Sequence, residues 1–295
     1  NEKLGKKIFI TGKGRCNITN ASEIEDLFSA VISNPKFLYS GFYSFTNDQV
    51  IHFFEELGVA TKIERGNRVF PVSDHSSDVI AALAREMQHL KVKVQLHCEV
   101  KELLINNERE IKGVRLANGK KMTAVVVATG GISYPSTGST GDGYRFARNC
   151  GHKVTELFPS LVPMEVKEWY AKELQGLSLK NIEIHITDGK KKLYDEFGEM
   201  LFTHFGVSGP LILSASAHMR HFDKKQYRLE IDLKPALSEE QLYDRITRDF
   251  ALLANHAAQG ALVKLLPSSM QPVMVARWGI DPATKANQIT REQKR

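Results

Sequence analysis

Cysteine is scarce in this chain, and long apolar runs are missing. The three cysteines among 295 residues, Cys16, Cys98 and Cys150, lie far apart and form no C-x-x-C pair. This spacing encodes neither a disulfide framework nor a zinc site, and a reducing compartment is the simplest interpretation. No run approaches the roughly 20 apolar residues of a membrane helix, and residues 1–10 lack the apolar stretch of a secretory signal. We therefore expect a cytoplasmic protein without a membrane partner.

Charge of one sign is not concentrated in any segment. Hydrophobic residues make up 42% of the chain and charged residues 25%, an ordinary balance that excludes a disordered chain. The net charge of +6 would suit an anionic partner such as a dinucleotide, a nucleic acid or an acidic substrate. The basic runs at 6–7, 190–192 and 224–225 are short and far apart in the sequence. This distribution favours a mildly basic soluble surface over a nucleic-acid footprint, so a nucleic-acid partner is disfavoured.

Apolar residues at helical spacing dominate the first ninety residues. They predict helices over residues 22–30, 47–57 and 77–89. After these helices the period changes to two, because apolar and polar residues alternate over 92–96. Such alternation is typical of a half-buried strand.

A small β-meander and a buried strand are expected next. Two strands are predicted at 102–105 and 111–116, and Asn118 with Gly119 predicts a hairpin turn, since both central positions of a type I′ turn need positive φ. Residues 122–128, MTAVVVA, form an apolar run of the kind that is buried on both faces in a parallel sheet.

A glycine-rich loop follows, with the sequence ATGGISYPSTGSTGDG at 128–143. Glycines allow positive φ and bring backbone N–H groups close to a flat or anionic ligand. The order of strand, loop and helix places this loop at the carboxyl end of a strand, where α/β sheets bind ligands. Asp142 begins the next helix and can either cap it or accept a hydrogen bond from a ligand hydroxyl. Within this glycine cluster, ligand contact is the favoured alternative.

The pattern changes where FPSLVP carries two prolines. Short alternating stretches then indicate a mostly β inserted domain over 159–236, and helical spacing indicates a helical part of the insert over 237–280. Residues 281–295 would start a return to the first domain, which we expect to occupy 1–158.

Three stretches carry a resemblance to a known family: GRCNITN in the loop 11–20, YPSTGSTGDG at 134–143, and GEMLFTHFGVSGP at 198–210. They resemble the bacterial NAD(P)/FAD-dependent oxidoreductases of the aminoacetone-oxidase type, which include bile-acid-pathway flavoproteins. TGG at 129–131 is shared with the wider superfamily of fumarate reductase flavoproteins. The resemblance covers nearly the whole chain. It implies an α/β fold with an incomplete Rossmann-like FAD-binding domain and its β-meander, plus inserted β-barrel-like and helical domains.

The resemblance also implies which residues bind FAD. The loop 11–20 would lie along the flavin and the pyrophosphate, Val100 would reach the adenine through its backbone, and the loop 129–143 would approach the isoalloxazine. The implied cofactor-binding residues are Gly12, Gly14, Arg15, Cys16, Asn17, Asn20, Val100, Thr129, Gly130, Gly131, Tyr134, Gly138, Thr140, Gly141, Asp142 and Gly143. Lys13 departs from the glycine usual in the family, and would add a cation near phosphate or point outward.

The same resemblance implies that the first βα unit of the FAD-binding domain is not part of this sequence. Relatives begin with a strand, the motif G-x-G-x-x-G and a helix, followed by an acidic residue that binds the adenosine ribose. On this resemblance, we expect the chain to start just past that acid and to stop before the segment that returns to the FAD domain. The pyrophosphate would therefore lack its helix N-terminus. We expect a chain with its first βα unit missing, truncated at both ends, that binds FAD more weakly than a complete protein.

Several candidate residues have a structural explanation beside the functional one. Packing is favoured for Cys16 over a redox role, because no second cysteine is close in sequence. Arg15 would either neutralise a phosphate or flavin anion or make a surface salt bridge. The aromatic residues within 37–45 are favoured as packing rather than as a stacking surface. His204 is a candidate substrate residue, although a lone histidine is more often structural.

These features lead to one main functional hypothesis and two alternatives. The first is an FAD-dependent oxidoreductase that transfers hydride or electrons between NAD(P)H or a small organic donor and a small-molecule substrate or oxygen. The sequence assigns no catalytic acid or base, no metal ligand, no substrate identity and no oligomeric state. The alternatives are a tRNA-associated flavoprotein, since some members of the wider superfamily act on tRNA, and an inactive fragment.

Overall fold

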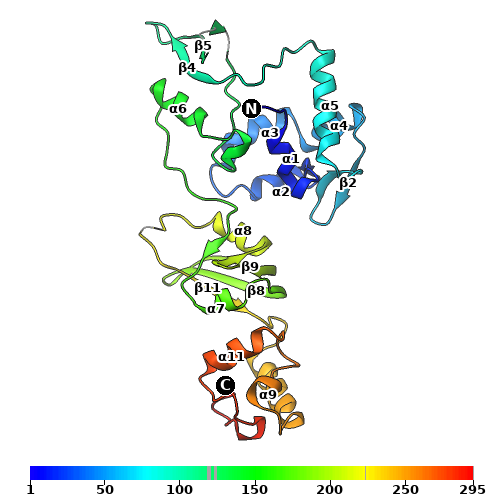
Figure 1. Cartoon of the computed structure of the whole chain (residues 1–295), viewed down its shortest axis with the longest axis vertical. Helices are drawn as coiled ribbons and strands as arrows, with labels where there is room; N and C mark the ends of the chain where they lie inside the picture. The colour runs from blue at the N-terminus through cyan, green and yellow to red at the C-terminus, as the bar shows by residue number, and fades with distance from the viewer. Residues whose placement is uncertain (118–120, 123–124, 223, 295) are drawn as a thin grey trace. The chain divides into compact units, whose positions relative to one another are not determined.

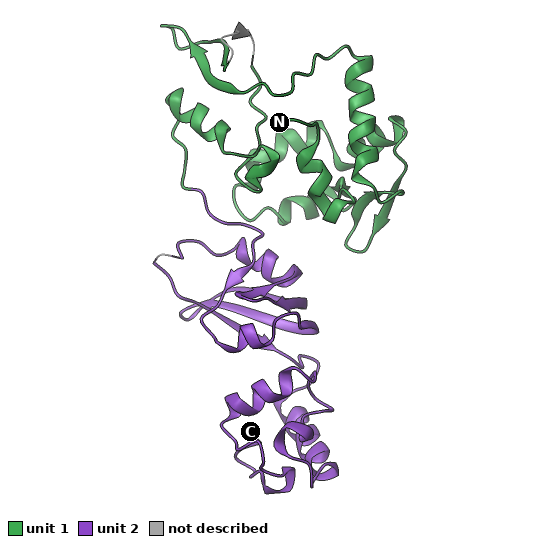
Figure 2. Cartoon of the chain, in the orientation of Figure 1, with its two compact units in different colours: residues 1–156 green, residues 157–295 purple. Residues whose placement is uncertain are grey.

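The chain divides into two compact units, shown on the computed structural model in Figures 1 and 2. Unit 1 is Asn1–Glu156 and unit 2 is Leu157–Arg295. Both units contain helices and strands, so the chain is of mixed α/β composition. No helix of the described residues is both long and apolar enough to cross a membrane. The residues that the structure describes are 1–117, 121–122, 125–222 and 224–294.

Short helices build most of unit 1. The three helices expected from apolar spacing are confirmed as α2, α4 and α5. At the start of α4, Thr46 and Gln49 form a capping box: Thr46 Oγ1 accepts from the Gln49 N–H at 3.2 Å and Gln49 Oε1 accepts from the Thr46 N–H at 2.8 Å. The helical elements are α1 (Lys6–Ile10), η1 (Thr11–Gly14), α2 (Ile24–Ser29), η2 (Pro35–Leu38), α3 (Tyr39–Ser44), α4 (Asn47–Glu56), α5 (Ser76–His89), η3 (Pro135–Thr137) and α6 (Asp142–Asn149).

Two antiparallel sheets complete unit 1, with strand orders β1-β3-β2 and β4-β5-β6. A small core forms where Val79 and Ala82 of α5 pack against Cys16 and Val59. The second sheet confirms the predicted meander strands, whereas the turn expected at Asn118-Gly119 lies outside the described residues. The strands are β1 (Thr19–Asn20), β2 (Thr61–Glu64), β3 (Arg68–Pro71), β4 (Val100–Ile105), β5 (Ile111–Leu116) and β6 (Lys121–Met122).

The predictions of two other strands, made from apolar runs, are wrong. Residues 92–96 form no strand, and residues 125–128 follow β6 without being part of any strand. The Val126 side chain is 91% exposed, and Val94 and Leu96 are exposed as well. A strand buried on both faces needs neighbours that pair with its backbone N–H and C=O groups. Within the described residues no strand pairs with either run, so its apolar side chains stay at the surface.

A five-stranded antiparallel sheet, half-barrel-like in form, is the centre of unit 2. Its order is β11-β8-β9-β10-β7. The predicted alternation is confirmed in β8, where Ile182, Ile184 and Ile186 are buried against Leu211 and Ile212 of α8. The elements are β7 (Met164–Glu165), α7 (Tyr170–Glu173), β8 (Ser178–Asp188), β9 (Lys191–Phe202), β10 (Gly206–Ser208), α8 (Pro210–Ser216) and β11 (Tyr227–Asp232).

Helices follow the sheet, as their spacing predicts. Ser238 and Gln241 form a second capping box at the start of α9, with Ser238 Oγ accepting from the Gln241 N–H at 3.2 Å. Phe250 of α9 is buried beside Val275 of α11 and Ile289. The helices are α9 (Glu239–Leu252), α10 (Ala258–Ala261), α11 (Met270–Trp278) and η4 (Ala286–Gln288). The expected division at 236/237 and 280/281, and the role of each part, stay predictions.

The buried face of β8 yields a stability prediction. Ile184→Ala should destabilise the protein by about 2–5 kcal/mol, because Ile184 is 0% exposed and its truncation leaves a cavity. Urea unfolding followed by circular dichroism measures the loss. Lys180→Ala, at an exposed position of the same strand, is the matched control and should change the free energy of unfolding by less than about 0.5 kcal/mol. Equal losses in the two variants would contradict this orientation of β8.

Candidate functional site

The loop after α1 contains a run of left-handed backbone. Gly12, Lys13 and Gly14 have φ angles of 62°, 60° and 86°, and Cys16 has a φ of 63°. Only glycine adopts this region without steric cost. The Cys16 N–H closes the turn by donating to the Thr11 carbonyl at 2.9 Å. Lys13, where we expect glycine from the resemblance, occupies the same left-handed conformation.

Side chains then fix this loop to the neighbouring sheet. The Asn17 amide lies 3.2 Å from the Val69 carbonyl and 3.0 Å from the Thr19 carbonyl. Asn20 Nδ2 donates to the Gly66 carbonyl at 2.9 Å. Both asparagines therefore have a structural role in this loop, and their contact with a cofactor stays a prediction.

Cys16 is buried in the core beneath the loop. Burial raises the pKa of its thiol above the ordinary value, because the thiolate would be poorly solvated there. A thiol that stays protonated is a poor nucleophile. The packing role favoured for Cys16 agrees with this environment.

Lys13 yields a second prediction. Lys13→Gly should stabilise the protein by roughly 0.5–1 kcal/mol, because the left-handed strain that is removed exceeds the added entropy of the unfolded chain. Thermal unfolding monitored by calorimetry measures the gain. Lys3→Gly is the control, since Lys3 is exposed and has no positive φ. A loss of stability in Lys13→Gly as large as in the control would show that position 13 is unstrained.

Arg15 lies in a compact charge cluster. Its Nε donates to Asp74 Oδ1 at 2.8 Å, and its two terminal nitrogens bond to the Glu64 carboxylate at 3.2 and 2.5 Å. Lys62 Nζ donates to Asp74 Oδ2 at 2.7 Å, and the guanidinium lies 4.2 Å from the Phe70 ring centroid. Of the two alternatives for Arg15, the structure shows the salt bridge. Its charge is balanced by two carboxylates.

The cluster lowers the pKa of both carboxyl groups. The Arg15 hydrogen bonds lower the pKa of Glu64, and hydrogen bonds from Lys62 and then Arg15 lower the pKa of Asp74. A depressed pKa contributes stability above the unfolded-state pKa, near 4, and this contribution is lost as pH falls through the lower folded-state pKa.

Acid unfolding therefore tests this cluster. We expect wild-type stability to fall between about pH 4 and pH 2 by more than that of Arg15→Met, because the substitution returns both carboxyls toward ordinary titration. Urea midpoints at pH 7, 4 and 2.5 measure the difference. Arg65→Met removes an exposed cation that has no ion pair among the described residues, and it should follow the wild-type curve. Parallel curves for Arg15→Met and wild type would contradict the pKa shifts.

The second glycine loop packs onto the start of α6. A β-carbon at Gly143 would lie 2.8 Å from Thr129 Oγ1, and one at Gly141 would lie 2.9 Å from Ile132 Cγ2. Gly141 also has a φ of 84°. These two glycines let residues 129–132 lie directly against the helix. The packing of the protein itself therefore favours glycine at both positions, whether or not a ligand is present.

Asp142 is the first residue of α6, and its carboxylate has two partners. Arg145 Nη2 donates to Oδ1 at 2.6 Å, and Thr140 Oγ1 donates to Oδ2 at 2.9 Å. The Arg145 hydrogen bonds, followed by the one from Thr140, hold the pKa of Asp142 below its ordinary value. Gly141 is the N-cap, and no side-chain capping bond forms there, so the alternative of Asp142 as a helix cap is wrong. Arg145 Nη1 also reaches the Lys101 carbonyl at 2.6 Å and links α6 to β4.

Lys7 joins the segment before the first loop to the second loop. Its ammonium donates a hydrogen bond to the Ser133 carbonyl and lies 5.4 Å from the centroid of the Tyr134 ring. Asn1 Nδ2 donates to the Thr137 carbonyl at 3.1 Å, which adds a second link. The sequence placed Lys7 in a short basic run and did not mark it as a site residue. Its position shortly before the first glycine loop could have marked it as a candidate.

Val100 and His204 belong to other elements of the chain than this junction. Val100 is half-buried at the start of β4, where it pairs with Leu116 of β5. His204 belongs to unit 2, in the turn between β9 and β10, where it is exposed and in edge-to-face contact with Phe205 at 4.8 Å. The substrate role of His204 stays a prediction.

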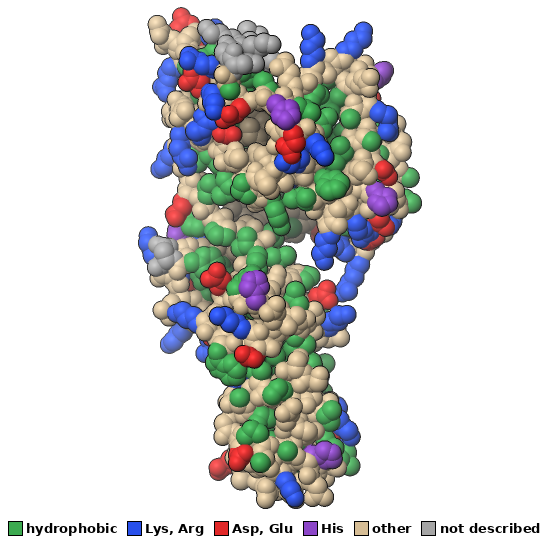
Figure 3. Space-filling view, viewed as in Figure 1, with side chains coloured by type: hydrophobic (Ala, Val, Ile, Leu, Met, Phe, Trp, Pro, Cys, Tyr) green, Lys and Arg blue, Asp and Glu red, His purple; other side chains and the backbone are tan. Residues whose placement is uncertain are grey.

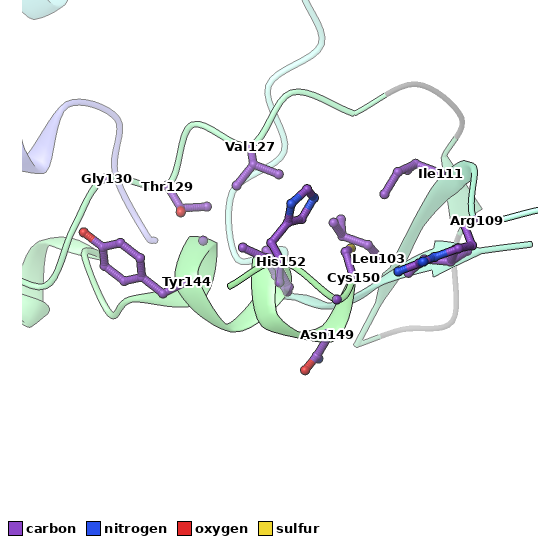
Figure 4. A pocket seen from close by; sticks show the side chains of 15 residues that line it. Leu103, Arg109, Ile111, Val127, Thr129, Gly130, Tyr144, Asn149, Cys150 and His152 are labelled. Carbon is purple, nitrogen blue, oxygen red and sulfur yellow. The ribbon is translucent and has the colours of Figure 1, made fainter. Parts of the chain in front are cut away.

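A pocket of about 720 Å³ lies between the β4–β5 hairpin and α6 (Figure 4). Leu103 and Val127 contribute apolar walls, Arg109 lies at the hairpin end, and the His152 ring projects beside Val127. A volume of this size suits a drug-sized ligand or part of a dinucleotide. Only three of the predicted cofactor residues line the pocket: Thr129, Gly130 and Gly143.

Comparison with known proteins gives the family. Residues 1–264 match the family described as HI0933-like protein Rossmann domain. The chain belongs to this HI0933-like family. The resemblance inferred from the glycine loops is therefore confirmed at the level of the family, and so is the α/β, Rossmann-type fold class.

This HI0933-like chain has curated relatives with two kinds of name. It is 29% identical over 276 residues to a 3-dehydro-bile acid delta(4,6)-reductase of Clostridium scindens, over 92% of this chain and 66% of that protein. It is 27% identical over 289 residues to a ribosomal RNA dihydrouridine synthase of Haemophilus influenzae, over 97% and 69%. A protein of the same name from Escherichia coli is 29% identical over 245 residues, over 81% and 59%. The chain thus spans about two thirds of the length of these relatives.

Proposed function

We propose that the protein is an FAD-dependent reductase that adds hydride to a carbon–carbon double bond conjugated to a carbonyl. The relatives' names support this choice. One relative is named as a delta(4,6)-reductase of a 3-dehydro bile acid, and two are named for making dihydrouridine, which is uridine with its C5–C6 double bond reduced. In each of these substrates the reduced double bond is conjugated to a carbonyl group. The shared chemistry is conjugate hydride addition.

The observation that carries the proposal is the junction of the two glycine loops at Lys7 and Tyr134. A flat, anionic cofactor needs close backbone approach, a cation and an aromatic or apolar surface, and this junction offers all three. Lys7, rather than Arg15, is the cation that would serve the cofactor, because two carboxylates balance Arg15. The backbone at Gly14 and Gly131 would lie along FAD, which supplies the two-electron hydride chemistry when bound. NAD(P)H or a small organic donor would restore the reduced cofactor.

Unit 1 is proposed as the FAD-binding part. The family match over residues 1–264 and the two glycine loops of this unit support the proposal. The parts 159–236 and 237–280 are proposed as the inserted β-rich and helical domains.

A ribosomal RNA substrate is the second candidate. Two relatives carry that function in their names, whereas the tRNA association considered from the sequence has no such support. On the face shown in Figure 3, basic side chains lie among acidic ones and form no continuous stripe. The mixed surface charge therefore favours a small-molecule substrate, whereas the names of two relatives favour RNA.

Direct measurement separates these candidates and the inactive fragment. The purified protein is titrated with FAD by calorimetry, then supplied with NADPH or NADH and either a 3-oxo-Δ4,6-steroid acid or ribosomal RNA lacking dihydrouridine. Loss of the steroid's dienone absorbance supports the small-molecule reductase, and formation of dihydrouridine supports the RNA enzyme. A protein that binds FAD but reduces neither probe contradicts the proposed chemistry, and one that binds no FAD is the inactive fragment.

Gly131 gives the sharpest test of cofactor position. Its φ is not positive, and an added β-carbon would meet only the Tyr144 hydroxyl at 3.5 Å, an ordinary contact. Gly131→Ala should therefore fold normally but weaken FAD binding by about tenfold or more, since a β-carbon displaces the cofactor by several tenths of an ångström. Titration calorimetry and the apoprotein melting temperature measure the two effects. Gly41→Ala, with nothing within 4 Å of the added carbon, is the control. Unchanged FAD affinity in Gly131→Ala would remove this glycine from the site.

A further inference from the structure

We propose that Tyr134 gives the proton that completes reduction of the substrate, and that Lys7 is the positioning residue that supports it. This inference rests on the reductase function proposed above. It concerns a residue that the sequence assigned only to cofactor contact. The argument uses the backbone of Tyr134, the exposure of its side chain and the charge beside its ring.

The backbone of Tyr134 is held in an unfavourable conformation. Its φ is 51°, in the left-handed region that bulky residues rarely adopt. Several contacts enforce it: the Thr137 N–H and Oγ1 both donate to the Tyr134 carbonyl, at 2.9 and 2.7 Å, and Lys7 bonds to the preceding carbonyl of Ser133. Strain that surrounding contacts over-determine is typical of functional positions. The contacts fix the direction in which the Tyr134 side chain leaves the loop.

The Tyr134 side chain is placed to meet a ligand. It is 68% exposed although its backbone is tightly held, and among the described residues its hydroxyl has no hydrogen-bond partner. It follows Gly131 by three residues, in the loop proposed to border FAD. A hydroxyl presented in this way can donate to a substrate carbonyl or carbon.

Lys7 supplies the matching charge. Its ammonium lies 5.4 Å from the Tyr134 ring centroid, and its hydrogen bond to Ser133 fixes it there. A cation at this distance attracts the face of an aromatic ring. Lys7 therefore helps to hold the Tyr134 ring in place beside the loop. It acts on Tyr134 and not on the substrate.

Other acids in unit 1 fit this task less well. Cys16 is buried, and burial raises the pKa of its thiol. Cys150 and His152 line the pocket beside the β4–β5 hairpin, at the opposite end of α6 from the loop that carries Tyr134. Tyr134 is the hydroxyl that combines exposure, a fixed backbone and an adjacent cation.

The chemical step balances. Hydride from the reduced two-electron donor forms a C–H bond at the carbon β to the carbonyl, and the π electrons of the double bond move toward the α-carbon and the carbonyl oxygen. The Tyr134 O–H bond then breaks as a C–H bond forms at the α-carbon. The phenolate recovers a proton from water. The substrate gains two electrons and two hydrogens, and the donor loses two electrons.

Tyr134→Phe in the FAD-loaded protein is the main test. It keeps the ring and the Lys7 contact and removes only the hydroxyl, so FAD affinity and melting temperature should not change. Single-turnover reduction of the steroid or RNA probe should slow by about 100-fold or more, in the range of general acid catalysis. Equilibrium binding of the same probe to the oxidised protein, a readout independent of turnover, should weaken by about threefold to tenfold through loss of one hydrogen bond. Tyr43→Phe, which removes an exposed hydroxyl from α3, is the matched control.

Two further readouts distinguish proton donation from a structural role. In D₂O the wild type should place deuterium on one face of the α-carbon, and Tyr134→Phe should lose that stereospecificity. At saturating FAD, Lys7→Met should lower the single-turnover rate without changing probe affinity, and Lys7→Arg should restore much of the rate. Wild-type reduction with an unchanged rate, affinity and stereospecificity in Tyr134→Phe overturns the role of Tyr134 alone. Failure of the wild type to reduce either probe overturns the proposed reductase and this inference with it.

Discussion

The contact of Lys7 with the Ser133–Tyr134 corner is the interaction on which the candidate site depends. One ammonium holds together two segments that lie 126 residues apart in the chain. The Asn1–Thr137 hydrogen bond is a second link between the N-terminal segment and the glycine loop before α6. The same cation sits beside the exposed aromatic ring of Tyr134. A structural link and a chemical environment thus come from a single side chain.

The glycines of the site have two different physical explanations. Positive φ favours glycine at Gly12, Gly14 and Gly141, and a β-carbon at Gly143 would displace the Thr129 side chain. The protein itself thus favours glycine at these positions even without a ligand. Gly131 differs, because the protein leaves ordinary space at its missing β-carbon. For this reason it carries more information about a bound cofactor than the rest of the motif.

Charge in unit 1 is arranged as local pairs. Arg15 is balanced by Glu64 and Asp74, and Asp142 is balanced by Arg145. The motifs contain the charged residues that a phosphate or ribose site uses. Arg15 and Asp142, however, are already paired with oppositely charged side chains of the protein. Lys7, bonded to a carbonyl and placed over a ring, is a cation of the site that makes no ion pair among the described residues.

The sequence by itself determined the family, the amphipathic helices α2, α4 and α5, the meander and the alternating face of β8, because these follow from local spacing and short motifs. It could not determine the environment of the apolar runs at 92–96 and 125–128, since burial of a strand depends on neighbours that local pattern does not specify. Only the tertiary structure decided that Arg15 pairs with carboxylates, that Asp142 does not cap α6 and that Lys7 meets Tyr134. Each of these is a contact between side chains or loops, and its partner is set by how the chain folds back on itself.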